Sequence, residues 1–267
     1  MSLRTRFAPS PTGPLHLGHA YSALLAHDTA RAAGGTFLLR LDDLDQSRAR
    51  PEWAAQIESD LAWLGLTWDG PVLRQSDRLP RYRAALAALW ERGLLYPCHC
   101  SRRDIEAAAS APQEGAPLHG PDGVIYPGTC RPAQPPGGPL PEGVALRLDM
   151  TRAAAAAGLD VTPLTYKETG VADPPGALGP DHFTRAIGDV ALARRGLGAS
   201  YHLAVVLDDA DQSITHVIRG ADLAPATPIH VLLQRLLGLP TPIYHHHRLI
   251  RDETGRRLAK RDDARAI

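Results

Sequence analysis

The chain has 267 residues, and its 29 Lys and Arg balance its 29 Asp and Glu, so the formal net charge is +0. A chain of this length predicts one or two domains with a full hydrophobic core. No apolar run approaches the roughly 18 residues of a membrane span, and the N-terminus lacks a signal-peptide pattern, so we expect a cytoplasmic protein with no membrane partner. The charge balance excludes a generally basic surface, and any RNA contact must come from a local arginine-rich face.

Apolar strands alternate with helical patterns along the chain, which predicts an α/β fold with a mainly parallel sheet. The predicted strands cover residues 4–8, 36–41, 144–148, 201–207 and 215–219. The predicted helices cover residues 15–33, a segment after Pro51, a segment before Gly93, and residues 229–237 with Gly238 as their end. Residues 111–143 contain nine Pro and seven Gly, which predicts a long irregular loop or insertion.

The first strand runs into a helix through the segment RFAPSPTGP of residues 6–14, followed by His16, Leu17, Gly18 and His19. A helix N-terminus after such a turn attracts anions through its unpaired N–H groups and its dipole. His16 and His19 are spaced i,i+3 and lie on one face, while Gly18 leaves room for a flat ring such as adenine. The segment predicts a nucleotide pocket, although an isolated pair of this kind can also be two solvated histidines.

A second motif lies near the C-terminus, where residues 257–261 read RLAKR. Lys260 is one of two lysines in the chain, the other being Lys167, because arginine supplies almost every other cation. A lysine retained in this polar stretch indicates a compact point charge on a flexible stem, as phosphate binding needs.

The two motifs together, HLGH and RLAKR, resemble the HIGH and KMSKS signatures of class I aminoacyl-tRNA synthetases. RFAPSPTGPLHLGH and the segment LRLDDLD of residues 39–45 resemble the glutamyl-tRNA synthetase branch. The resemblance runs from about Arg4 to Lys260. Full glutamyl-tRNA synthetases carry a further anticodon-binding half, so the length and the cysteine pattern are more similar to their truncated paralogues, the glutamyl-Q tRNA(Asp) synthetases.

This resemblance implies a class I Rossmann-type nucleotide-binding fold in two halves, split by an insertion. Residues 1–95 would form the first half, and residues 189–267 the second half with the KMSKS-like loop. Residues 96–188 would form an inserted, acceptor-binding-like module that carries a zinc site. Ligands would bind at the carboxyl ends of the parallel strands.

The implied reaction is the ATP-dependent activation of L-glutamate to glutamyl-adenylate, with Mg²⁺ carried by ATP. Glutamate would then pass to the queuosine base at the wobble position of tRNA(Asp). His16, His19 and Lys260 would stabilise the charge that grows on the phosphate oxygens, and with Gly18 they would form the ATP site. A monomer is expected. Two alternatives stay open: a short glutamyl-tRNA synthetase that charges a tRNA 3′ end, and a noncatalytic paralogue that binds ATP, glutamate or RNA.

The resemblance also implies a glutamate site, with Arg6 and Arg219 on the carboxylates, Asp42 on the ammonium and Tyr201 on the side chain. Its remaining members would be Phe7, Ala8, Pro9 and Ser10. The family usually has Glu where Asp42 stands. The residues alone also allow purely structural interpretations. Asp42, Asp43 and Asp45 could form a solvated turn, Tyr201 could be a strand-end aromatic, and Arg219 could belong to a surface ion pair.

Cys98, Cys100 and Cys130 are too few for a disulfide framework, and clustered thiols in a cytosolic chain favour zinc. By ligand type, His99 or His119 could complete the set. The resemblance instead favours Tyr126, because Tyr-x3-Cys matches the family pattern, although the long Gly/Pro stretch before Tyr126 departs from the compact family form. Three reduced cysteines without metal are the alternative.

Two further polar tracts are interpreted as strand ends and not as metal sites. The tract His245–His247 cannot point three consecutive strand side chains at one ion. Asp208, Asp209 and Asp211 resemble a cation site by composition only.

Overall fold

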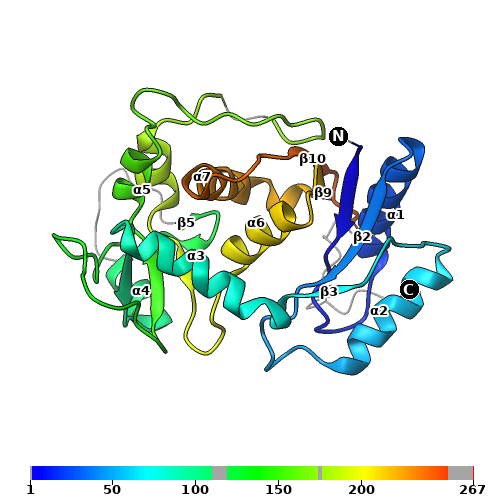
Figure 1. Cartoon of the computed structure of the whole chain (residues 1–267), viewed down its shortest axis with the longest axis horizontal. Helices are drawn as coiled ribbons and strands as arrows, with labels where there is room; N and C mark the ends of the chain where they lie inside the picture. The colour runs from blue at the N-terminus through cyan, green and yellow to red at the C-terminus, as the bar shows by residue number, and fades with distance from the viewer. Residues whose placement is uncertain (1, 110–118, 174–175, 252–266) are drawn as a thin grey trace.

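The computed structural model describes residues 2–109, 119–173, 176–251 and 267. Figure 1 shows one sheet with its covering helices at one end of the molecule, a second sheet at the other end, and helices between them. The RLAKR segment with Lys260 lies outside the described residues. Across the described ranges, no helix combines the length and the apolar character that a membrane crossing requires.

The α-helices have the following bounds: α1 Leu17–Ala32, α2 Pro51–Trp63, α3 Leu79–Glu91, α4 Arg102–Ala109, α5 Met150–Ala156, α6 Tyr201–Asp211 and α7 Thr227–Leu237. Shorter helical segments are η1 Gln75–Arg78, η2 His182–Ile187 and η3 Ala221–Ala226. The strands are β1 Arg4–Phe7, β2 Thr36–Leu41, β3 Leu73–Arg74, β4 Leu95–Cys98, β5 His119–Gly120, β6 Gly123–Val124, β7 Ala145–Leu148, β8 Ala191–Ala193, β9 His216–Gly220 and β10 Ile243–His247.

The sheet at one end is parallel, as the alternation of strands and helices predicts. β1 pairs with β2 from Arg4↔Thr36 to Phe7↔Leu39, β2 pairs with β3, and β9 pairs with β10. β9 lies beside β1, where the Thr215 N–H donates to the Arg4 carbonyl at 3.0 Å. The chain therefore leaves β1 toward β2 on one side and returns through β9 on the other, which creates a switch point at β1.

The second sheet is antiparallel and has the order β4, β7, β8. β8 lies beyond residue 188, so this sheet continues past the proposed end of the inserted module. The division into residues 1–95, 96–188 and 189–267 stays a prediction.

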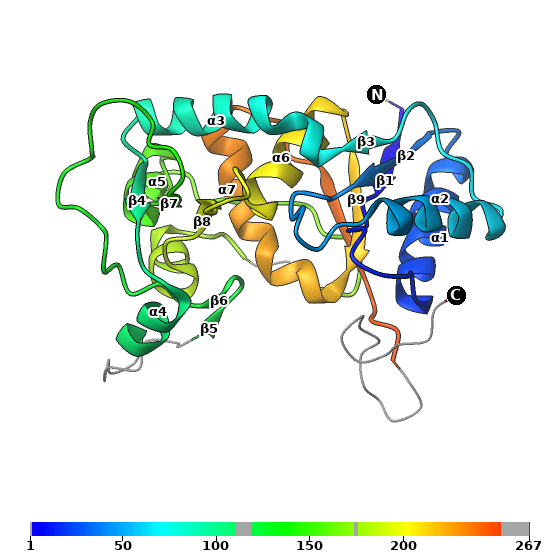
Figure 2. The same cartoon turned by 90° about the horizontal axis from the view of Figure 1, so that it is seen from below.

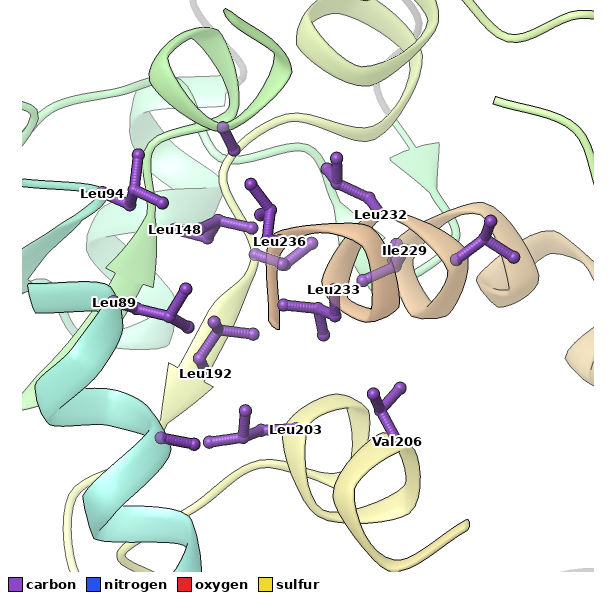
Figure 3. Close-up of a cluster of buried hydrophobic side chains, with 14 of the residues drawn as sticks. Leu89, Leu94, Leu148, Leu192, Leu203, Val206, Ile229, Leu232, Leu233 and Leu236 are labelled. Carbon is purple, nitrogen blue, oxygen red and sulfur yellow. The ribbon is translucent and has the colours of Figure 1, made fainter. Parts of the chain in front are cut away.

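The two largest hydrophobic cores of the described residues hold these parts together. Apolar side chains of α1 and α2 pack on β1 and β2 in one core, where α1 contributes the small residues Ala23, Ala26 and Ala30. The larger core joins α3, α6 and α7 to β7 and β8, and Figure 3 shows Leu192 of β8 among Leu89, Leu203 and Leu233. Figure 2 shows α3 running from the region of the first sheet to the second. One continuous core therefore connects the second sheet to the helices beside the first sheet.

Residues 201–207 form a helix, so the strand predicted for this run is wrong. Ser200 caps α6, its Oγ accepting the Leu203 N–H at 3.5 Å, and residues 202–209 are all buried. A helix that is buried all round reads as a continuous apolar run, which periodicity cannot distinguish from a buried strand. The other predicted strands and helices form near their expected bounds, and α7 ends at Gly238 with φ 66°.

Candidate active site

A cavity of about 670 Å³ lies at the carboxyl ends of β1 and β9, next to the start of α1. This is the switch point of the parallel sheet, where open α/β folds bind their ligands. Every ATP-binding and glutamate-binding residue expected from the sequence and described by the structure lines this cavity: Arg6, Phe7, Ala8, Pro9, Ser10, His16, Gly18, His19, Asp42, Tyr201 and Arg219. Their individual roles stay predictions, and Lys260 cannot be placed because it lies outside the described residues.

The first turn of α1 carries the two imidazoles. His16 is the N-cap, and its Nδ1 accepts the Gly18 N–H at 3.1 Å, while the His19 Nδ1 accepts the His16 N–H at 3.2 Å. The two rings stack with their centroids 3.7 Å apart. Because both Nδ1 atoms are acceptors, a neutral ring carries its proton on Nε2, which can donate to an anion. The helix start thus combines imidazole donors with the positive end of the helix dipole.

Gly18 has a local role that its spacing did not indicate. A Cβ at this position would lie 3.0 Å from Cε1 of His16. The missing side chain therefore makes room for the capping ring of His16. Gly18 also lines the cavity, and the close approach of adenine to its backbone stays a prediction.

Arg6 and Arg40 share the buried carboxylate of Asp209. Arg6 makes a two-point pair with it, at 2.9 Å from Nε and 3.2 Å from Nη2, and the Arg40 Nη1 donates to it at 2.7 Å. Burial raises the pKa of Asp209, but the charges of Arg6 and Arg40 more than offset this and hold it below its ordinary value. Asp208, Asp209 and Asp211 all lie on α6, so their interpretation as strand-end acids is wrong, and each pairs with an arginine.

Asp42 follows β2 and lines the cavity beside Arg40, whose Nε donates to Asp42 Oδ1 at 3.1 Å. Burial raises the pKa of Asp42 to about 6, against the opposing charges of Arg40 and Arg6. Asp42 is therefore an anion at neutral pH that loses its charge in mild acid.

The neighbouring acids of the LRLDDLD segment, Asp43 and Asp45, make local hydrogen bonds that hold the loop after β2. Asp43 accepts the Ser76 N–H and hydroxyl, both at 2.8 Å, and so ties this loop to η1. Asp45 accepts the Arg48 Nε at 2.5 Å within an exposed turn. Of the three acids, Asp42 is the one that lines the cavity.

Arg219 closes the opposite wall from the end of β9 and is 5% exposed. Its Nη1 donates to the Tyr201 hydroxyl at 3.3 Å, and Tyr201 is the first residue of α6 instead of the start of a strand. Within the described part of the chain, Arg219 has hydrogen bonds to uncharged groups and no ion pair, whereas Arg6 is paired with Asp209. The two arginines therefore offer different charge to a ligand: Arg6 is neutralised and Arg219 is not.

The three cysteines converge at the end of β4, whose last residue is Cys98. Their Sγ atoms all lie within 4.8 Å of one another, and the Tyr126 hydroxyl lies 3.5 Å from the Sγ of both Cys98 and Cys100. On a tetrahedral zinc with Zn–S of about 2.3 Å and Zn–O of about 2.0 Å, a sulfur and an oxygen ligand are roughly 3.5 Å apart. The donor set of Cys98, Cys100, Tyr126 and Cys130 thus fits zinc in both chemistry and spacing.

Within this cluster the pKa of Cys130 is lowered, whereas burial raises the pKa of Cys100 and that of Tyr126. Burial raises the pKa of Cys130, but the Tyr126 hydroxyl and other hydrogen bonds bring it down to about 7. Burial raises the pKa of Tyr126, whose oxygen accepts the Cys130 N–H at 2.8 Å and whose ring lies 3.7 Å below the Arg147 guanidinium. A bound metal ion reverses such a rise because its charge favours the anionic ligand.

The two histidines considered as fourth ligands do not join this cluster. His99 and His119 are exposed, and among the described His, Cys, Asp and Glu residues the cluster consists of the three cysteines alone. Of the three candidates for the fourth position, Tyr126 is therefore the one that the structure brings to the sulfurs.

Several polar residues of the cavity escaped the sequence analysis: Ser22, Arg40, Arg48, Asp222 and His247. An arginine inside the apolar run of β2 was a usable signal for Arg40, which is fully buried. Ser22 follows His19 by three residues and so shares its helix face. His247 belongs to the tract that was correctly placed on a strand, and its Nε2 lies 2.7 Å from the Ser22 Oγ.

Comparison with known families agrees with this fold. The sequence matches the family described as tRNA synthetases class I (E and Q), catalytic domain, over residues 2–119 and 179–267. The chain belongs to this family of class I synthetases and is a ligase. The α/β class and the resemblance stated from the motifs are confirmed.

Individual relatives indicate which branch of this family the chain is most similar to. The chain is 66% identical to a Rhodobacter capsulatus protein named glutamyl-Q tRNA(Asp) synthetase, over 98% of this chain and 92% of the relative. It is 41% identical to the Geobacter sulfurreducens protein of that name, over 98% of this chain and 76% of the relative. A solved glutamate tRNA ligase from Elizabethkingia meningosepticum, in complex with its amino acid, matches with a TM-score of 0.73 and 27% identity. That match covers 98% of this chain and 53% of the ligase.

Proposed function

We propose that this chain activates L-glutamate with ATP and transfers the glutamate to the queuosine base at the wobble position of tRNA(Asp). The observation that carries the proposal is the single cavity that holds both the paired imidazoles of α1 and the set of charged groups suited to glutamate. The names of the relatives support the acceptor.

In the first step, a carboxylate oxygen of glutamate attacks the α-phosphorus of ATP, and the bond to the bridging oxygen of pyrophosphate breaks. Negative charge builds up on the phosphate oxygens, so the site needs fixed donors aimed at them. The Nε2 donors of His16 and His19 and the helix N-terminus would take this role, and Lys260 would add a point charge. Mg²⁺ would enter with the nucleotide and offset charge on its phosphates.

Glutamate recognition divides among three charged groups. Arg219 lacks an ion-pair partner among the described residues, so it would take one carboxylate of the amino acid. Asp42 would accept the ammonium group, and Tyr201 would touch the side chain beside Arg219. Arg6, already paired with Asp209, would bind a carboxylate more weakly and mainly keep the wall of the cavity polar.

In the second step, a hydroxyl of the queuosine base attacks the acyl carbon of glutamyl-adenylate. An ester bond forms, AMP leaves, and the hydroxyl proton is lost. No protein nucleophile is needed, so the chain contributes placement of the two reactants.

The cysteine cluster would serve a structural zinc. Cys98, Cys100, Tyr126 and Cys130 would hold one ion, which would fasten β4 to the segment after β6. Such a site contributes folding free energy and takes no part in the chemistry.

The experiment that tests the activating function is ATP–pyrophosphate exchange without tRNA. We expect exchange that depends on glutamate and fails with glutamine. His16→Ala, His19→Ala and Lys260→Ala should each slow exchange by about 10²–10³-fold, because they remove transition-state donors. His27→Ala, two turns further along α1, is the matched control and should keep the rate. A folded wild-type chain with no exchange would favour the noncatalytic alternative.

A further inference from the structure

Three acceptors outside the cavity lining fix the guanidinium of Arg219. Its Nε donates to His246 Nε2 at 3.0 Å, Nη1 donates to His230 Nδ1 at 3.2 Å, and Nη2 donates to Thr227 Oγ1 at 2.8 Å. All three side chains are at most 2% exposed. These contacts set the plane and direction of the guanidinium.

Two longer contacts face the ligand space. Nη1 also donates to the Tyr201 hydroxyl and Nη2 to the Leu223 carbonyl, both at 3.3 Å, and both residues line the cavity. All five N–H groups of Arg219 are therefore occupied. A carboxylate can take over the two weak, cavity-facing donors while the three buried contacts hold the guanidinium in place.

Glu168 determines which nitrogen of His246 carries the proton. Its Oε1 accepts three backbone N–H groups, from Thr169 at 3.1 Å, Gly170 at 2.7 Å and His246 at 3.0 Å. Its Oε2 lies 2.5 Å from His246 Nδ1. The carboxylate is therefore ionised and accepts the proton of Nδ1, which leaves Nε2 as the acceptor that Arg219 Nε–H needs.

The backbone on both sides of Glu168 is hydrogen-bonded to β10. The Tyr244 N–H donates to the Lys167 carbonyl at 2.9 Å, and the Val171 N–H donates to the His246 carbonyl at 2.7 Å. A Cβ on Gly170 would lie 2.1 Å from the His246 carbonyl oxygen, so this approach requires glycine. The Glu168 side chain is 2% exposed, and its position is set by these contacts.

Arg219, His246 and Glu168 form one hydrogen-bonded relay, and a second relay starts at Nη1 of Arg219. His230 accepts from Arg219 at Nδ1, and its Nε2 lies 3.1 Å from His202 Nδ1. His202 Nε2 in turn lies 3.4 Å from Asp122 Oδ1, in the turn between β5 and β6. The donors of both relays point away from Arg219 toward a distant carboxylate. Neither carboxylate touches Arg219, so the positive charge remains available to a ligand.

We propose that Glu168 is a positioning residue that, through His246, orients Arg219 and thereby selects a substrate with a free carboxylate. The inference rests on the proposed function, in which Arg219 binds a carboxylate of glutamate. It adds residues to that site that neither touch the substrate nor line the cavity.

The variant Glu168→Gln tests the relay because it should reverse the proton order. The three backbone donors require an oxygen at the Oε1 position, so the amide nitrogen must take the Oε2 position and donate to His246 Nδ1. The proton of His246 then moves to Nε2 and meets the Nε–H of Arg219, donor against donor. We expect the KM for glutamate to rise by about tenfold to a hundredfold, with a much smaller change in the KM for ATP.

Nitrogen chemical shifts of the histidine rings supply a readout that a general loss of packing would not produce. The His246 signal, assigned from His246→Gln, should show the Nδ1-protonated form in the wild type and the Nε2-protonated form in Glu168→Gln. Glu91→Gln, exposed at the end of α3, is the matched control and should change neither the tautomer nor the KM. An unchanged tautomer, or a KM for glutamate within about twofold of wild type, would overturn the proposal.

A second pair of variants keeps the test decisive if Glu168→Gln does not fold. Thr227→Val removes one buried acceptor of Arg219 at nearly constant volume, and Thr227→Ser retains it. The valine variant should raise the KM for glutamate by about tenfold, and the serine variant should stay near wild type. Equal KM values for the two would refute the orienting role. A wild-type chain without exchange would instead refute the proposed function, and the tautomer measurement would still decide the relay.

Discussion

Replacing Asp209 by asparagine removes the shared carboxylate between Arg6 and Arg40. Both arginine residues are at most 4% exposed, and together they make three hydrogen bonds to Asp209 between 2.7 and 3.2 Å. Asparagine keeps the shape but leaves buried Arg6 without its carboxylate partner, while Arg40 keeps only its ion pair with Asp42 at 3.1 Å and a longer one with Asp208 at 4.0 Å. Removing one partner of a buried ion pair costs about 3–5 kcal/mol, so we expect a loss of this size in the free energy of unfolding.

The assay is urea unfolding at pH 7, followed by circular dichroism. Asp211→Asn is the matched control, because Asp211 lies on the same helix and also pairs with two arginines, Arg78 and, at 2.9 Å, Arg81, but its side chain is 31% exposed. A pair this exposed contributes about 0–1 kcal/mol. The lowered pKa of Asp209 also means that its contribution is present above its unfolded pKa and disappears as the pH falls through the folded value. Equal losses in the two variants would refute the reasoning.

Two further outcomes follow from the metal cluster and from the acid beside the cavity. Purified protein should contain about one zinc per chain, and Cys130→Ser should lose the zinc and loosen the second sheet. If protein that was never exposed to a chelator contains no zinc, the metal site is refuted and the cysteines are simply reduced thiols. The KM for glutamate should rise as the pH falls through about 6, because Asp42 is protonated there and loses its attraction for the ammonium group. Asp42→Asn should have a weak affinity at every pH, and a wild-type KM that is flat between pH 7 and pH 5 would contradict the role of Asp42.

The residues next to the turn after β1 could be predicted because their spacing carries the chemistry. His16 and His19 lie in the first turn of the helix that follows the first strand, and local rules place them on one face at the edge of the sheet. Arg6, Tyr201 and Arg219 were assigned to the glutamate site only by the resemblance, since a single aromatic or arginine at a strand or helix end has no local signature.

The buried polar network could not be predicted, because it depends on which helix faces turn inward. The run that forms α6 is buried on all sides, so it was interpreted as a strand, and Asp209 as an acid at a strand end. Its hydrogen-bond partner Arg40 lies 169 positions away in the sequence. Glu168 carried no signal at all, since only the approach of residues 167–171 to β10 gives it a partner.

The most direct test of the proposed function is to determine the site on the tRNA to which glutamate is attached. Labelled glutamate, ATP and Mg²⁺ are incubated with queuosine-containing tRNA(Asp) whose 3′-terminal adenosine has been removed, and the RNA is then cut into fragments. We predict that the label is incorporated and stays with the anticodon fragment, while the same tRNA lacking queuosine accepts none. Labelling of intact tRNA(Glu) at its 3′ end, with none on the queuosine-containing tRNA(Asp), would contradict the account and support a short glutamyl-tRNA synthetase.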